Sequence, residues 1–251
     1  MRGGVVIGVA ALACLAVPGV GAPEDPLVER GRNVYTASCV SCHGPEGQGV
    51  LSPTRGSGGI VGLGPPLRGV GARAADFYLR TGYMPLRDPS DQPRRQRPLL
   101  SDREIDAVVA YVASLGGPPV PKPHPERGSL REGLELFTEY CAGCHQVVGE
   151  GGVVTGAVAP PLGRATAVQI AEAVRIGPYV MPRFSRRQIS DRQLDSIVRY
   201  VQASQDPEDA GGWGIGHLGP VPEGMVAWLI AGSALVLVAV AIGKRLKEGD
   251  E

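Results

Sequence analysis

The chain has 251 residues, and its 25 basic and 25 acidic side chains cancel to a formal net charge of zero. Without a basic excess the chain lacks the electrostatic footprint of a nucleic-acid-binding protein, so we predict no nucleic-acid partner. Aromatic residues make up only 5% of the chain, whereas Gly and Pro number 37 and 23. A domain of about 100 residues with so few aromatics has a thin apolar core and needs a further apolar body to fold around.

Residues 1–22 are predicted to be an export signal or an N-terminal apolar anchor. Arg2 is followed by an uncharged apolar run that ends in small residues at Ala22, as in secretory signals. Pro23 directly after this point disfavours cleavage, and Cys14 lies in a weak lipoprotein-like context. Cleavage, retention and lipidation all stay open, whereas export from the cytoplasm is expected.

The first domain is predicted to span residues 24–115. It contains Cys-Val-Ser-Cys-His at positions 39–43, which is the spacing that attaches a c-type haem. In this interpretation the thiols of Cys39 and Cys42 form thioethers with the porphyrin. His43 reaches the iron as an axial ligand.

A proline-dense linker, residues 116–128, is predicted to be semi-rigid, and residues 129–204 form the second domain. This domain repeats the motif as Cys-Ala-Gly-Cys-His, with Cys141 and Cys144 for attachment and His145 as the axial ligand. The landmarks follow in the same order in both halves, which indicates internal duplication. We therefore predict two covalently bound haem c groups, one in each domain.

The second axial ligand of each iron is predicted to be a methionine. Met84 and Met181 occupy matching places downstream of the two motifs, and each is followed by Pro, which keeps the backbone out of a helix. His/Met ligation leaves no open coordination position and suits electron transfer. We therefore expect no catalytic residues, and this ligation argues against a catalytic di-haem enzyme such as a peroxidase or a thiosulfate dehydrogenase.

The helices that close each half have clear start signals. Ser101 and Ser190 each precede Glu or Gln by three residues, which is the capping-box pattern, and apolar residues then recur at helical spacing. We expect each closing helix to pack crosswise on the helix before the Cys pair, with Tyr35 or Phe137 at the crossing. The predicted fold class is all-α, with two tandem class I-type cytochrome c domains and a C-terminal transmembrane helix.

Arginines are concentrated in the loop after Met84. They form a predicted basic rim at the edge of the first haem, which could steer an acidic partner, or they are simply solvated. The four residues are Arg87, Arg94, Arg95 and Arg97.

Cys-x-x-Cys pairs have two other common uses in proteins. Together the pairs could form one four-cysteine zinc site, but this leaves both trailing histidines unexplained. A thioredoxin-like redox motif expects a strand before the pair and a helix after it, whereas residues 29–38 read as helix.

The C-terminal end is predicted to cross the membrane. After a membrane-proximal segment, 205–224, no charge occurs from 225 to 243, which is long enough for a transmembrane helix. The tail, 244–251, begins with basic residues and is therefore placed in the cytoplasm. The haem domains then lie on the outer face of the cytoplasmic membrane. A buried helix of a soluble domain is the alternative.

The whole pattern resembles one family. The features are the two haem domains, the proline linker and the Gly-rich segment 211–224 that leads into the C-terminal span. They are similar to the di-haem cytochrome c subunit of the actinobacterial-type menaquinol–cytochrome c reductase, a cytochrome bc complex. The chain departs from the usual member in its shorter apolar N-terminus.

The resemblance implies a place in a respiratory chain, as the electron-transfer subunit of a quinol–cytochrome-c reductase, a translocase. Its partners would be cytochrome b and Rieske iron–sulfur subunits, with electrons passing from the Rieske protein to a terminal oxidase of the cytochrome c oxidase type. The alternative is an electron-accepting di-haem subunit of an outer-surface dehydrogenase.

Overall fold

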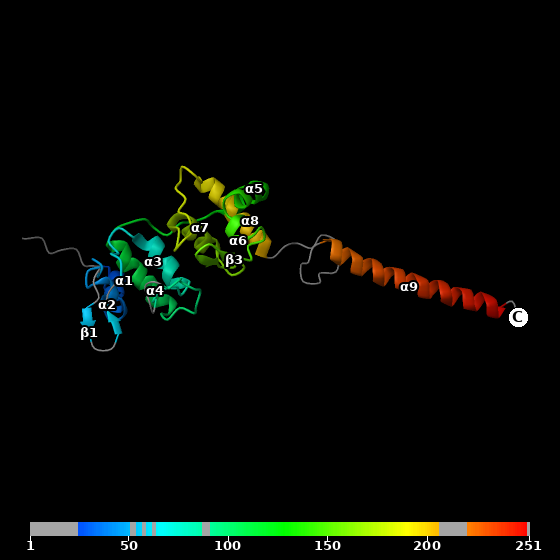
Figure 1. The fold of residues 1–251 in the computed structure, drawn as a ribbon, viewed down its shortest axis with the longest axis horizontal. Coiled ribbons are helices and arrows are strands. Elements are labelled where there is room, and N and C mark those ends of the chain that lie inside the picture. Colours follow the sequence, from blue (N-terminus) through cyan, green and yellow to red (C-terminus); the bar gives the residue numbers. More distant parts are fainter. Residues whose placement is uncertain are drawn as a thin grey trace, which may run out of the picture.

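In a computed structural model the protein consists of two helical halves and a long C-terminal helix (Figure 1). The first half contains α1 (Pro26–Ser38), α2 (Val40–His43), β1 (Thr54–Gly56), β2 (Gly59–Val61), α3 (Gly71–Arg80) and α4 (Asp102–Ser114). The second contains η1 (Pro125–Arg127), α5 (Leu130–Tyr140), α6 (Ala142–His145), β3 (Gly152–Val154), β4 (Ala157–Ala159), α7 (Ala167–Ile176) and α8 (Asp191–Gln205), and α9 (Pro220–Gly249) ends the chain.

The structure describes residues 25–50, 54–56, 59–61, 64–86, 91–205 and 220–249. The predictions for residues 1–22 and for Arg87 lie outside these ranges. Most of the predicted membrane-proximal segment does so too.

The core of the first half is a close crossing of α1 and α4. A Cβ atom placed on Gly31 would lie 1.9 Å from the carbonyl oxygen of Ala107, so only glycine allows the two helices to approach this closely. Tyr35 is fully buried at the crossing, and its hydroxyl donates a hydrogen bond to the carbonyl oxygen of Gly44 at 2.6 Å. The predicted crossing with Tyr35 is confirmed.

The second half repeats this arrangement with α5 and α8. A Cβ atom on Gly133 would lie 2.0 Å from the carbonyl oxygen of Ser196. Phe137 is buried beside it and lies 5.3 Å from the Tyr200 ring, measured between ring centroids. The matching glycine and aromatic residue explain why these landmarks recur in the sequence.

Both predicted capping boxes are present. Ser101 precedes α4, and its backbone N–H donates to the carboxylate of Glu104 at 2.8 Å. Ser190 precedes α8, and its backbone N–H donates to the side-chain oxygen of Gln193 at 2.9 Å. These bonds satisfy donors that a helix start leaves without partners.

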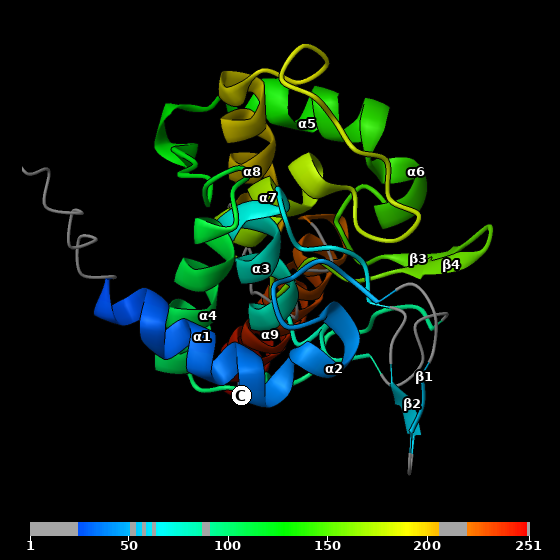
Figure 2. The ribbon, with the colours of Figure 1, turned by 90° about the vertical axis from the view of Figure 1, so that its left-hand side faces the viewer.

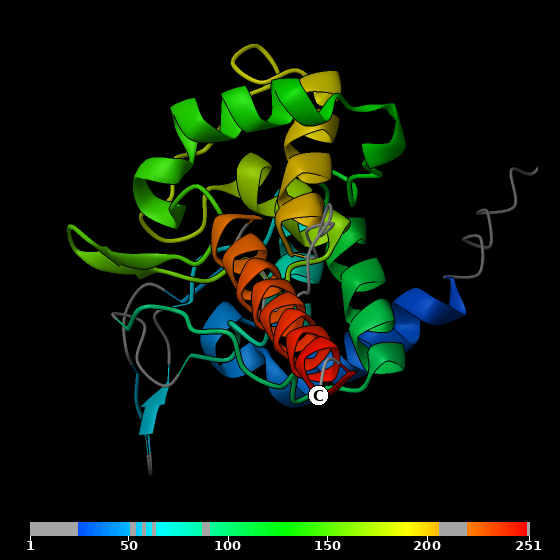
Figure 3. The ribbon, with the colours of Figure 1, turned by 90° about the vertical axis from the view of Figure 1, so that its right-hand side faces the viewer.

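The structure adds two small hairpins that the sequence analysis did not predict. Strand β1 pairs antiparallel with β2, and β3 pairs antiparallel with β4. Each strand has three residues, which is too short to give a recognisable alternation of apolar and polar side chains. Both hairpins project from the same side of the molecule (Figures 2 and 3). The all-α class is nevertheless confirmed, because helices make up the core of both halves.

The two halves contact each other through α3 and α7. The linker is hydrogen-bonded to both halves: the N–H of Arg73 donates to the carbonyl oxygen of Pro118 at 3.2 Å, and the N–H of His124 donates to the carboxylate of Asp195 at 2.7 Å. These bonds hold the linker against both domains.

Helix α9 extends beyond the predicted span 225–243 at both ends. Its segment Gly224–Arg245 is long and apolar enough to cross a membrane, and none of its apolar core is buried within the protein. Trp228 is 80% exposed. The apolar surface of α9 is not covered by other described parts of the chain, so α9 is not a core helix of a soluble domain. This argues for a membrane anchor.

Candidate functional site

Each Cys-x-x-Cys-His motif forms a single helical turn directly after a longer helix. In the first half the N–H groups of Cys42 and His43 donate to the carbonyl oxygen of Cys39, at 3.2 and 2.9 Å. The second half has the same two bonds to the carbonyl oxygen of Cys141, at 3.1 and 2.9 Å. Residues three and four apart share one face of a helix, so each turn presents two sulfur atoms and one imidazole together.

The two motif histidines are oriented by proline carbonyl groups. Nδ1 of His43 lies 2.8 Å from the carbonyl oxygen of Pro65, and Nδ1 of His145 lies 3.2 Å from that of Pro160. A proton on Nδ1 leaves Nε2 as the nitrogen with a free lone pair, as a metal-binding histidine requires. The repeated Pro-Pro-Leu segments thus supply the acceptor that positions each ring.

Burial lowers the pKa of His145 below its usual range, so this ring is neutral at pH 7. A neutral imidazole is the form that binds a metal.

The first cysteine of each pair lies in an apolar environment. Burial raises the pKa of Cys39 and of Cys141 to about 11. Reactive cysteines in redox motifs have lowered pKa values because a positive environment stabilises the thiolate. The environment here suits an uncharged thioether and argues against a thioredoxin-like motif.

The zinc alternative also lacks support in the structure. The two Cys pairs lie in separate halves: the first cysteine of each pair directly precedes α2 or α6, and the second lies within that helix. No three His, Cys, Asp or Glu side chains gather at a metal-binding distance within the described ranges.

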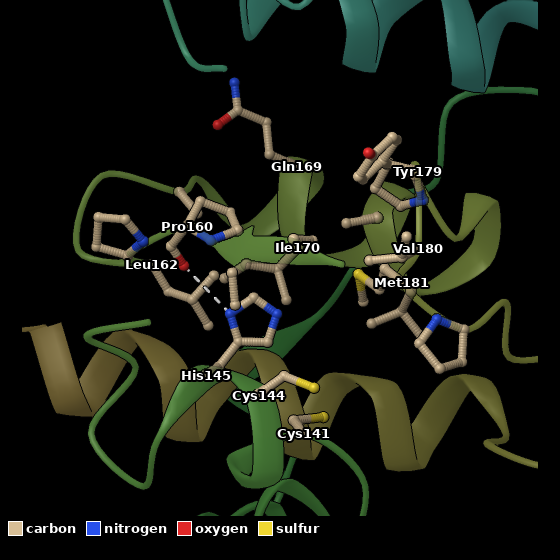
Figure 4. Close-up of a pocket in the computed structure, with 18 of the residues that line it drawn as sticks. Cys141, Cys144, His145, Pro160, Leu162, Gln169, Ile170, Tyr179, Val180 and Met181 are labelled. Atoms are coloured by element: carbon tan, nitrogen blue, oxygen red, sulfur yellow. Dashed lines mark hydrogen bonds between the residues drawn. The ribbon is translucent and has the colours of Figure 1, made fainter. Parts of the chain in front are cut away.

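In the second half, a mostly apolar cavity brings the predicted ligands together. Cys144 and His145 enter it from α6, Cys141 from the residue directly before α6, and Met181 from the loop after α7 (Figure 4). Further apolar walls come from Leu162 and Ile170, among others. Two thiols, a neutral imidazole, a thioether and an apolar wall match the needs of a covalently bound haem with His/Met ligation.

Among the described residues of the first half, Met84 lines a cavity apart from the other predicted ligands of that half. Met84 is half-buried after α3, in a cavity that Gly82, Pro85 and Leu86 also line. Cys39, Cys42 and His43 are not among the residues that line it. Met84 as a ligand therefore stays a prediction from the sequence.

The structure separates the arginines that the sequence analysis grouped at the first haem. Arg94 and Arg97 line the cavity beside Met84. Arg95 instead lines the cavity of the second half, together with Gln92. Both residues come from the first half, and no local sequence pattern indicates that they reach a site about 70 residues further on in the chain.

Comparison with known proteins gives two family matches. The model described as "Cytochrome c" matches residues 28–116. The model described as "Cytochrome C oxidase, cbb3-type, subunit III" matches residues 128–201.

Several curated relatives share most of the chain. The "Cytochrome bc1 complex cytochrome c subunit" of Mycobacterium tuberculosis is 37% identical over 232 residues, covering 88% of this chain and 79% of the relative. The protein of the same description from Corynebacterium diphtheriae is 34% identical over 241 residues, covering 88% and 82%. Among solved structures, cytochrome c4 from Pseudomonas stutzeri is 21% identical with a TM-score of 0.24, covering 70% of this chain and 97% of that one, a score too low to carry an argument.

Proposed function

This chain belongs to the family of cytochrome c subunits of the cytochrome bc1 complex, and from that premise we propose that it carries electrons from a Rieske iron–sulfur protein to a terminal oxidase. The family implies electron transfer in a quinol–cytochrome c reductase, in which this chain is an enzyme subunit only as part of the complex. The two cytochrome c domains indicate covalently bound haem c. The handover from the Rieske protein, the complex with cytochrome b and the oxidase partner are parts of the proposal.

We propose that the chain holds two haems. Cys39 and Cys42 would attach the first, and Cys141 and Cys144 the second. The axial ligands would be His43 with Met84 and His145 with Met181. When bound, haem supplies an iron that cycles between Fe(II) and Fe(III). The single observation that best supports the proposal is the cavity that His145, Met181 and the second Cys pair share.

The protein side chains have defined tasks in this proposal. Pro65 and Pro160 hold the imidazoles through Nδ1. Met84 and Met181 would each hold the iron through the thioether sulfur, which would leave oxygen and peroxide no place to bind. The mostly apolar walls of the second cavity would surround the haem with an environment that suits electron transfer.

We propose that α9 anchors the chain, with the haem domains on the outer face of the membrane. Lys244 and Arg245 lie at the end of the candidate span, and basic residues flanking a span favour the cytoplasmic side. Protease added to intact spheroplasts should remove the haem domains and leave the C-terminal tail protected. Protection of the haem domains would contradict this orientation.

The experiment that tests the whole proposal compares the full chain with a truncation after Asp206. The full chain should contain close to two haems by a pyridine haemochrome assay and should co-purify with cytochrome b and Rieske subunits. The truncated chain should keep both haems and lose these partners. One haem per chain would contradict the di-haem assignment. Co-purification with a dehydrogenase, and never with a Rieske protein, would favour the alternative function.

A further inference from the structure

The cavity of the second half is completed by the first half of the chain. Part of its wall comes from α3 and from the loop that follows it, through Phe77, Thr81, Tyr83, Gln92, Pro93 and Arg95. The proposed second haem would therefore contact both domains. A cofactor pocket with walls from two domains depends on how the domains are docked.

Gln92 fastens the loop of the first half to the hairpin of the second. Its Nε2 donates to the carbonyl oxygen of Val158 at 2.7 Å, and the N–H of Val158 donates to its Oε1 at 2.9 Å. The side-chain amide of Gln92 thus makes the same pair of hydrogen bonds to β4 that the backbone of a neighbouring strand would make. It fixes the loop three residues before Arg95.

Arg95 reaches the same cavity as a half-buried cation. Its Nη2 donates to Oε1 of Gln169 at 2.7 Å. Gln169 is buried at the start of α7, where Oε1 also accepts from the N–H of Thr166 at 3.3 Å. Figure 4 shows its side chain pointing from the second cavity toward the ribbons of the first half. One hydrogen bond thus fixes a guanidinium that has five donors.

Within the described part of the chain, Arg95 has no carboxylate partner. Burial lowers the pKa of Arg95, and the nearby cation Arg164 adds to this effect, although Tyr83 opposes it. An arginine stays protonated in proteins even so. A half-buried guanidinium without a counter-charge is unfavourable unless an anion joins it.

Haem carries two propionate carboxylates at one edge of an otherwise apolar ring. We propose that Arg95 of the first half is the charge partner of a propionate of the second haem, and that Gln169 positions its guanidinium. This inference rests on the proposed second haem site. It adds a residue from the opposite domain that binds the cofactor and tunes its potential.

The expected consequence is electrostatic. A cation beside the haem opposes the extra positive charge of Fe(III) and so raises the reduction potential of that haem. Removing it should lower the potential of the second haem and leave that of the first unchanged. A guanidinium–carboxylate pair is also among the stronger hydrogen bonds in proteins, so its loss should change the vibrations of the propionate.

The experiment is an optical redox titration of the full-length, haem-loaded protein. The variants are Arg95→Gln, Arg95→Lys and, as control, Arg94→Gln. Arg94 is the exposed neighbour at the Met84 cavity and has the same charge. The step that belongs to the second haem is identified with Met181→Ala. Resonance Raman spectra of the propionate bending region provide a second readout.

Arg95→Gln should lower the reduction potential of the second haem and shift the propionate band. Arg95→Lys should restore much of that potential. Arg94→Gln should leave the potential of the second haem as in the natural chain. Gln169→Leu, which keeps the charge but frees the side chain, should give a smaller shift in the same direction.

An unchanged second potential in Arg95→Gln, or equal shifts of both haems, would overturn the inference. Absence of haem from the second site in the unmutated chain would instead overturn the proposed function, so the two failures are distinguishable. If Arg95→Gln does not load haem, the Gln169→Leu titration decides alone, and an unchanged second potential in that variant would overturn the inference.

Discussion

Replacing Glu172 by glutamine is expected to make the stability of the protein much less dependent on pH. Glu172 lies on α7 at the contact with α3 and is fully buried, and neither carboxylate oxygen has a hydrogen-bond partner in the described part of the chain. Burial raises its pKa to about 9, and the nearby carboxylate of Asp76 adds to this effect, although Arg80 and Arg73 oppose it.

The size of the effect follows from proton linkage. Because the folded protein holds the proton of Glu172 more tightly than the unfolded chain does, binding of this proton stabilises the fold. This contribution is fully present below the ordinary pKa of 4.5 and is lost as the pH rises toward 9. Each pH unit in this window costs about 1.4 kcal/mol, so between pH 5 and pH 8 the natural chain should lose about 4 kcal/mol through this group. Glutamine has the same shape and no proton to lose.

The assay is urea unfolding of the full-length, haem-loaded protein in detergent at several pH values, followed by circular dichroism. The free energy of unfolding of Glu172→Gln, relative to the natural chain, should rise by about 4 kcal/mol from pH 5 to pH 8. Glu135→Gln is the matched control, because Glu135 is a glutamate on the exposed surface of α5. Equal pH dependence in Glu172→Gln and the natural chain, or the same flattening in the control, would refute the reasoning.

Three further outcomes are expected. Gly133→Ala should destabilise the second half by about 3 kcal/mol or more, because the added methyl group would meet the backbone of Ser196. The control Gly143→Ala, where nothing lies within 4 Å of the added methyl group, should change the urea midpoint little. Equal effects of the two substitutions would contradict the close helix crossing. Met181→Ala should open the second iron to carbon monoxide and remove part of the far-red sulfur-to-iron band, whereas carbon monoxide binding by the unmutated protein would argue against methionine ligation. Ser101→Ala should cost about 1 kcal/mol of stability through the lost capping box, and Ser101→Asp should restore most of it; an unchanged urea midpoint for the alanine variant would show that the cap contributes nothing.

Much of this protein is determined by local sequence patterns. The Cys-x-x-Cys-His spacing matches a helical turn, so residues three and four apart share a face wherever the turn forms. The capping boxes at Ser101 and Ser190 start α4 and α8 through bonds within four residues. Gly31 and Tyr35 recur as Gly133 and Phe137 because the same helix crossing is built twice. The apolar run after residue 224 has the length of a membrane span without reference to any other element.

How the two halves share a site depends on tertiary packing. The contact of α3 with α7 buries Glu172 against Asp76, and it brings Arg95 and Gln92 to the second cavity. It also shows which carbonyl groups, those of Pro65 and Pro160, orient the histidines. These contacts join residues that are 15 to 96 positions apart in the sequence. They depend on the packing of whole domains, and this packing leaves no periodic pattern in the sequence. Local spacing therefore identifies each haem motif but does not indicate which residues of the other domain lie against it.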